Sequence, residues 1–146
     1  MLNADRIVPL LWQGSDPPLG PTVKACGVDV LVLCARERQH SAKHFPGVEV
    51  IYAPMDDGEH VPIDLAMRTA QLAATRHIAG KRVLICCLAG LNRSGLVSAL
   101  TLWYRYGSSG AACVRRVQER RPDALCNPTF TRFLEQLPPR RRLSPQ

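Results

Sequence analysis

Short apolar runs alternate along the chain with longer segments in which apolar residues recur at helical spacing. Four of the short runs have the length and composition of β-strands, namely residues 7–12, 28–34, 48–52 and 83–86. The runs 28–34 and 83–86 are apolar almost throughout, which predicts strands that are buried on both faces. Strands of this kind occur in a sheet that helices cover on both sides.

The longer segments predict helices over residues 22–26, 62–78, 94–107, 111–121 and 127–137. Gly80 follows the second helix as a stop, and His77 is expected on that helix's surface. Asn127-Pro128 begins the last helix with an N-cap and a proline at the first helical position. Strands that alternate with helices predict an α/β fold, a three-layer αβα sandwich with a mostly parallel central sheet. In such folds the functional site lies at the carboxyl ends of the strands.

Length and composition fit one domain. The chain has 146 residues, of which 46% are hydrophobic, and this is enough for a single core. We expect a domain over residues 1–137 and a disordered tail over residues 138–146, which are rich in proline and arginine. We find no signal peptide and no apolar run of membrane-spanning length, so we expect no membrane contact. Six cysteines in such a chain favour reduced thiols in the cytoplasm.

The charge balance narrows the class of partner. Lys and Arg total 19 against 12 Asp and Glu, and the net charge of +7 suits anionic ligands. The arginine clusters at residues 115–116, 120–121 and 140–142 have no interleaved aromatic residues, so we interpret them as solvated surface and tail rather than a nucleic-acid site. The cysteine spacings do not match the paired patterns of zinc sites, and we predict no bound metal. We expect a monomer.

The segment after the strand 83–86 has the parts of a phosphate-binding loop. Five residues separate Cys87 from Arg93, and a helix begins directly behind them. Gly90 permits a positive φ, which lets successive amide groups turn toward an anion, and the helix start adds free N–H groups and a positive dipole end. Arg93 offers a planar fork for two phosphate oxygens. The motif is not a nucleotide-binding P-loop, because no Gly-Lys-Ser/Thr follows it.

Cys87 lies at the base of this loop, where the amides, the helix dipole and the guanidinium favour a thiolate. A thiolate in this place is a nucleophile for phosphorus, and the hydroxyl of Ser94 can donate a hydrogen bond to the sulfur when it departs. The plainer alternative makes Cys87 a small buried hydrophobe and Arg93 a solvated helix residue. We prefer the catalytic interpretation, because a buried strand, Gly90, Ser94 and a helix accompany the spacing.

The second chemical candidate is the acidic stretch at residues 54–60. Breaking a phosphate ester requires a proton for the departing oxygen, and a carboxylic acid commonly provides it. Asp56 and Asp57 follow the strand 48–52, and adjacent extended residues point in opposite directions. The alternative is that both aspartates are turn residues beside Gly58.

The sequence Cys87-Leu-Ala-Gly-Leu-Asn-Arg-Ser94 resembles the signature loop of the cysteine-dependent dual-specificity protein phosphatases, within the protein tyrosine phosphatase superfamily. The resemblance spans residues 12–137. It implies the fold of that superfamily, no cofactor, and a phosphate-binding loop formed by Cys87, Leu88, Ala89, Gly90, Leu91, Asn92 and Arg93. Cys86 is a departure, because the family has at this position a histidine that orients the loop and favours the thiolate.

The stretch Pro54-Met-Asp-Asp-Gly58 is similar to the Pro-Phe-Asp-Asp-Gly loop of the regenerating-liver phosphatases. The second aspartate is the acid in those enzymes. The resemblance therefore implies that Asp57 is the general acid of this chain, in preference to Asp56.

The resemblance implies a phosphomonoester hydrolase that works through a phosphocysteine intermediate. The chain carries no long insertion, which indicates a shallow pocket for phosphotyrosine that would also admit phosphoserine and phosphothreonine of a protein or peptide. Leu88, Leu91 and Asn92 stand where phosphoinositide phosphatases carry lysines, which argues against an inositol head group. Two alternatives stay open. Residues 90–95 resemble the loop of RNA triphosphatases, which allows an RNA 5′-phosphatase, and the missing histidine allows a pseudophosphatase that only binds phosphorylated partners.

Cys34 is a candidate redox partner of the nucleophile. It ends one predicted buried strand and Cys87 follows another, so a parallel sheet would place both thiols at the same edge. The stretch Leu33-Cys-Ala-Arg-Glu37 also resembles the Leu-Cys-Ala-Glu-Arg of the phosphatase and tensin homologue, and this resemblance implies a disulfide between Cys34 and Cys87. The alternative is that Cys34 is a small buried hydrophobe.

Overall fold

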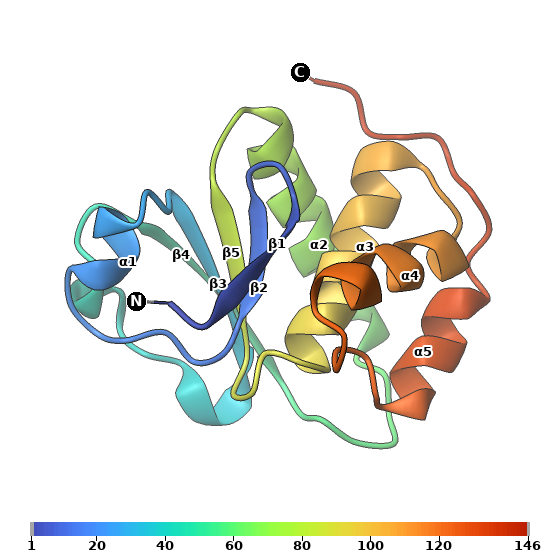
Figure 1. Cartoon of the computed structure of the whole chain (residues 1–146), viewed down its shortest axis with the longest axis horizontal. Helices are drawn as coiled ribbons and strands as arrows, with labels where there is room; N and C mark the ends of the chain where they lie inside the picture. The colour runs from blue at the N-terminus through green and yellow to red at the C-terminus, as the bar shows by residue number, and fades with distance from the viewer. Residues whose placement is uncertain (1, 146) are drawn as a thin grey trace.

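The computed structural model describes residues 2–145, and Met1 and Gln146 lie outside the described part of the chain. One sheet contains the strands in the order β1-β2-β5-β3-β4 (Figure 1). Neighbouring strands are parallel except for the antiparallel pair of β1 and β2. The mostly parallel sheet predicted from the sequence is therefore confirmed. The strands are β1 (Ala4–Val8), β2 (Leu11–Gly14), β3 (Val30–Ala35), β4 (Glu49–Met55) and β5 (Val83–Cys86).

Helices cover both faces of this sheet unequally. Figure 1 shows α2, α3, α4 and α5 gathered on one side and α1 on the other. The α/β sandwich is thus confirmed, with one thick and one thin helical layer. No helix within residues 2–145 has both the length and the apolar character needed to cross a lipid bilayer. The helices are α1 (Thr22–Ala25), α2 (Ile63–Ile78), α3 (Arg93–Tyr106), α4 (Gly110–Arg120) and α5 (Pro128–Glu135), with short 3₁₀ helices at Arg36–Arg38 and Ala42–His44.

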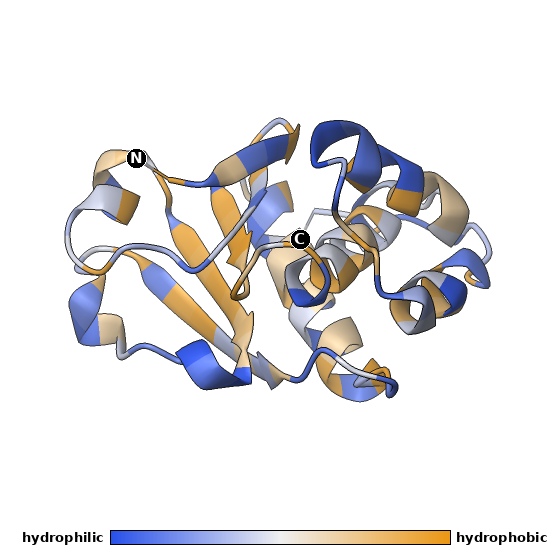
Figure 2. Cartoon of the chain, turned by 60° about the horizontal axis from the view of Figure 1, so that its bottom comes forward, coloured by the Kyte–Doolittle hydropathy of each residue, from blue (hydrophilic) through white to orange (hydrophobic). Residues whose placement is uncertain are grey.

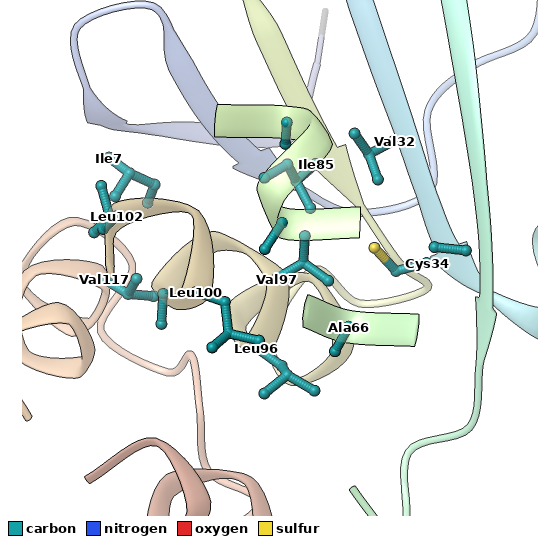
Figure 3. Packing of buried hydrophobic residues seen from close by; sticks show 14 of the residues in the cluster. Ile7, Val32, Cys34, Ala66, Ile85, Leu96, Val97, Leu100, Leu102 and Val117 are labelled. Atoms are coloured by element: carbon teal, nitrogen blue, oxygen red, sulfur yellow. The ribbon is translucent and has the colours of Figure 1, made fainter. Parts of the chain in front are cut away.

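The central strands contribute side chains to two hydrophobic cores. In β3, Val32 and Cys34 point into the large core under α2 and α3 (Figure 3). Their neighbours Leu31 and Leu33 point into the small core on the α1 side. This alternation explains why the strand is apolar at every position, since each face meets a different layer. Figure 2 shows the same pattern, with apolar strands inside and hydrophilic residues on the outer helix surfaces.

The predicted strand at residues 7–12 is divided in the structure. The chain reverses between Val8 and Leu11 and forms the hairpin of β1 and β2. Pro9 has no N–H group for the ladder, and Leu10 adopts a φ of +68°. The apolar run predicts extended backbone correctly but does not reveal the turn inside it.

The C-terminal segment is predicted from its composition to be disordered, yet its described part follows α3. The indole of Trp103 donates to the Pro138 carbonyl at 2.8 Å, and the guanidinium of Arg140 lies over the rings of Trp103 and Tyr104. The Leu143 amide donates to the Tyr104 carbonyl at 2.8 Å. These contacts give residues 138–143 a defined course over the helical layer, and Arg140 is not the free solvated cation that the arginine pattern indicated.

Candidate active site

The predicted phosphate-binding loop connects the carboxyl end of β5 to the start of α3. Gly90 has a φ of +75°, and a side chain at this position would place its Cβ 2.4 Å from the Gly14 backbone. Only glycine satisfies both the conformation and the close approach to β2. Within residues 2–145, the N–H groups of residues 88–93 donate to no protein acceptor. The loop therefore presents a row of free donors, as an anion site requires.

Two buried side chains hold this loop from behind. The Gln13 amide donates to the Gly90 carbonyl at 3.0 Å. The guanidinium of Arg121 donates to the carbonyls of Gly90 at 2.8 Å and Ala89 at 3.1 Å, and it also pairs with Asp5 at 2.9 Å. Because these carbonyls are turned toward the support, the loop's N–H groups are left for a ligand.

The prediction that the 120–121 pair is solvated is wrong for Arg121, which is only 8% exposed. Its side chain is buried against the loop because it bonds to Asp5 and to two loop carbonyls. Arg120 is exposed, as expected.

Cys87 is nearly buried at the base of the loop, with 4% of its surface exposed. Its sulfur lies 3.2 Å from the hydroxyl oxygen of the fully buried Ser94. This distance allows the hydroxyl to donate to a thiolate. The structure thus brings together the two residues that the sequence predicts as nucleophile and sulfur partner.

Arg93 is 7% exposed and is fixed by Glu37. Its two terminal nitrogens, Nη1 and Nη2, donate to the Glu37 carboxylate at 2.6 and 2.9 Å, and Nη1 also donates to the Met55 carbonyl at 3.1 Å. The Nε atom is buried and has no partner within the described residues. The guanidinium edge formed by Nε and Nη2 has the geometry to bind two oxygens of a phosphate.

The bonds from Arg93 hold the pKa of Glu37 down at about 2, and the same pairing raises the pKa of Arg93. Both groups are therefore ionised at neutral pH. Glu37 was not predicted as a site residue, although it lies in the stretch that carries the Cys34 resemblance.

The two aspartates of the predicted acid loop follow β4 directly and bind different partners. Asp56 pairs with Arg36 at 3.0 Å on the exposed surface. Asp57 turns to the phosphate-binding loop, where it accepts from the Asn92 side chain at 3.0 Å and from the Asn127 side chain at 2.8 Å. The carboxylate beside the loop is thus the one chosen from the sequence.

Cys34 is fully buried in the same core as Cys87. The parallel register pairs Leu33 of β3 with Cys86, the last residue of β5, and Cys34 and Cys87 directly follow this pair. Neighbouring strands are about 4.8 Å apart. Burial, followed by the charges of Cys87 and Cys86, raises the pKa of Cys34.

Cys86 points to the opposite face of the sheet from Cys34 and Cys87. It lies in the small core with Leu33 and Phe45, whereas the other two thiols belong to the large core. Burial raises the pKa of Cys86, and the charges of Cys87 and Asp16 act in the same direction. Cys86 therefore contributes an apolar contact to the small core.

The comparisons with known proteins agree with this geometry. Residues 11–138 match the family model described as dual specificity phosphatase, catalytic domain. Among curated proteins, no relative matches the chain.

Solved structures of phosphatases have the same fold. The crystal structure of human DUSP28 is 27% identical and has a TM-score of 0.78, covering 92% of this chain and 91% of that one. Tk-PTP in its active form is 26% identical with a TM-score of 0.78, covering 92% and 97%. PTPMT1 in complex with PI(5)P, at 20% identity and a TM-score of 0.78 over 92% and 93%, shows a likeness of fold alone. The family model covers nearly the whole chain, and the chain belongs to the dual-specificity phosphatase family.

Proposed function

We propose that this protein is a cysteine-dependent phosphomonoesterase that removes phosphate from phosphotyrosine, and also from phosphoserine and phosphothreonine, in proteins or peptides. The observation that carries the proposal is the unpaired edge of Arg93. Its buried Nε has no acceptor within residues 2–145, and it lies in a loop whose N–H groups are also free there. A buried donor without a partner is costly, and a bound phosphate would supply the missing acceptors.

The first half of the reaction transfers phosphate to Cys87. The thiolate attacks phosphorus while the bond to the leaving oxygen breaks, and Asp57 gives that oxygen a proton. The loop N–H groups and Arg93 stabilise the negative oxygens of the transition state, where charge stabilisation and positioning supply most of the rate.

The second half restores the enzyme. Water attacks the phosphocysteine, Asp57 takes a proton from that water, and the sulfur–phosphorus bond breaks to release inorganic phosphate. The sulfur departs as a thiolate, and the Ser94 hydroxyl at 3.2 Å donates a hydrogen bond to it.

The charges around the site favour a monophosphate ester of a protein over a polyanion. Arg93 is paired with Glu37 and Arg36 with Asp56, and Arg38 and His40 both pair with Asp16. The cationic excess lies instead on the helical layer, where Arg115 and Arg120 are exposed, while Arg116 pairs with Glu119 at 4.0 Å. An RNA 5′-triphosphate or an inositol polyphosphate would require uncompensated cations at the site, so phosphorylated protein is the better substrate class. We further propose a cytoplasmic monomer.

The test compares turnover of phosphotyrosine and phosphoserine peptides, an aryl phosphate and a 5′-triphosphorylated RNA. We expect turnover of the peptides and the aryl phosphate, abolished by Cys87→Ser. Preferred release of phosphate from the RNA would assign the chain to the RNA phosphatases. Tight phosphopeptide binding without turnover would make it a pseudophosphatase.

A further inference from the structure

Asp57 is exposed, yet both of its carboxylate oxygens are held. Oδ2 accepts from the side-chain nitrogen of Asn92 at 3.0 Å, and Oδ1 accepts from that of Asn127 at 2.8 Å. Asn127 also donates to the Gly58 carbonyl at 2.9 Å. In Figure 1 the loop after β4 meets the starts of α3 and α5 at this place. Two segments that are far from Asp57 in the sequence therefore fix its carboxylate.

The orientation of each amide is determined by a backbone N–H group. The Asn127 N–H donates to the Asn92 Oδ1 at 2.9 Å, and the Thr129 N–H donates to the Asn127 Oδ1 at 2.9 Å. A backbone N–H can only donate, so each side-chain oxygen must face it. Each NH₂ group must then face Asp57. A flipped amide would place its oxygen against the Asp57 carboxylate, so that two acceptors would face each other. Only one orientation of each amide is therefore possible.

Helix capping accounts for only part of this network. Asn127 caps α5 through its side-chain oxygen. Capping does not require its side-chain nitrogen, which is free to bind Asp57. Asn92 occupies the N-cap position of α3 but makes no side-chain cap bond. An asparagine at an N-cap normally accepts from its own helix. Here the Asn92 side chain is turned away from α3 toward Asp57 and Asn127.

We propose that Asn92 and Asn127 are positioning residues for proton transfer by Asp57. The inference rests on the proposed phosphatase function and deepens it. Each carboxylate oxygen has two lone pairs, and the amides occupy one on each oxygen. A free lone pair of the carboxylate remains to hold the proton that Asp57 gives to the leaving oxygen. In the second step it accepts a proton from the attacking water. Asn92 directly precedes Arg93 in the chain. The bond from Asn92 to Asp57 therefore also fixes the position of the acid relative to the arginine that would bind phosphate.

The cleanest probe is Asn127→Ser. Serine can still cap α5, but it is too short to reach Asp57. A misplaced catalytic group can cost about 100-fold, so kcat/KM for phenyl phosphate should fall at least about tenfold further than kcat/KM for p-nitrophenyl phosphate, whose acidic leaving group needs little protonation. Thr131→Ala is the matched control, because it changes the first turn of the same helix without touching Asp57.

A double-mutant cycle with Asp57→Asn completes the test. If Asn127 acts through Asp57, adding Asn127→Ser to Asp57→Asn should cause no further change in the ratio of the two esters. Equal losses on both esters, or losses that add in the double variant, would make Asn127 merely structural and overturn the inference. A flat ratio in Asp57→Asn itself would remove Asp57 as the acid and the inference with it. The proposed function fails separately, if Cys87→Ser leaves p-nitrophenyl phosphate turnover intact.

Discussion

The Glu37 carboxylate binds both terminal nitrogens of Arg93, at 2.6 and 2.9 Å, and leaves the Nε of Arg93 without a partner among the described residues. This end-on pairing fixes the plane of the guanidinium while its other edge stays free. Glu37 extends from the 3₁₀ helix that follows β3, so the fold sets the direction of the arginine before a phosphate binds. Such preorganisation reduces the entropy lost when substrate is bound.

Replacing Glu37 by glutamine should weaken this arrangement. The neutral amide has one acceptor oxygen in place of two, so it would hold at most one of the two Arg93 nitrogens. The plane of the Arg93 guanidinium would then no longer be fixed by two bonds. We therefore expect kcat/KM to fall roughly 10- to 100-fold for all esters. Steady-state kinetics on two esters of different leaving group measure the effect. Glu59→Gln, at an exposed carboxylate of the loop after β4, is the control. A loss confined to esters with poor leaving groups would contradict a role in phosphate binding.

The same pair predicts a pH dependence. The pKa of Glu37 in the folded protein is lowered from 4.5 to about 2 by the bonds from Arg93. A lowered folded pKa contributes stability above the unfolded value, and this stability is lost as the pH falls from about 4.5 toward 2. The acid limb of a rate profile near neutrality should therefore be unaffected by Glu37→Gln.

Removing Arg121 should damage stability and activity together. Arg121→Ala removes one of the two donors to the Gly90 carbonyl and leaves the Ala89 carbonyl and Asp5 without theirs, which should cost about 2 kcal/mol of unfolding free energy. Because the loop loses its support, both activated and unactivated esters should react more slowly by a similar factor. Urea denaturation and kinetics measure the two effects. The exposed Arg120 makes Arg120→Ala a neighbouring control, and an equal effect there would disprove the support role.

The sequence predicts the parts of the site that are local in the chain. Cys87, Gly90, Arg93 and Ser94 lie within one short stretch of sequence, so their spacing alone predicts the chemistry. The side chains that hold these residues in place are distant in the sequence. Glu37 lies 56 positions from Arg93, and Arg121 lies 31 positions from Gly90. A charged residue in a loop has the same appearance in sequence whether it is solvated or bonded to such a partner.

The same limit applies to His77, which the helical pattern places on the surface. It is buried, because its Nε2 donates to the Pro9 carbonyl at 2.7 Å and its Nδ1 accepts from Arg105 at 3.2 Å. The packing of α2 against its neighbours places the ring beside the hairpin, and its partners come from the β1–β2 turn and from α3. The pattern within one helix contains no information about them.

His77 should make the protein less stable in mild acid. Burial lowers the pKa of His77 below 6.5, and the charge of Arg105 acts in the same direction, while the bond to Pro9 opposes them. The unfolded chain then binds more protons, so the unfolding free energy falls as the pH drops below about 6.5. Urea denaturation at several pH values should show a weaker decline in His77→Gln than in the parent. Parallel curves would show that other groups cause the dependence.

The last prediction is that Cys34 protects the nucleophile from peroxide. Hydrogen peroxide converts the Cys87 thiolate to a sulfenic acid, and the Cys34 sulfur then attacks it, forming a disulfide and releasing water. Cys34 and Cys87 directly follow the paired residues Leu33 and Cys86, on neighbouring strands that lie about 4.8 Å apart, and a disulfide requires the two Cα atoms to come within about 7 Å. The raised pKa of Cys34 leaves little thiolate at neutral pH, so the step should be faster at higher pH.

Peroxide followed by dithiothreitol should restore activity to the parent and to Cys86→Ser, whose side chain faces the other core. It should restore far less to Cys34→Ser, because its sulfenic acid is oxidised further. Equal recovery in all three proteins, with no Cys34–Cys87 linked peptide by mass spectrometry, would leave Cys34 as a buried hydrophobe.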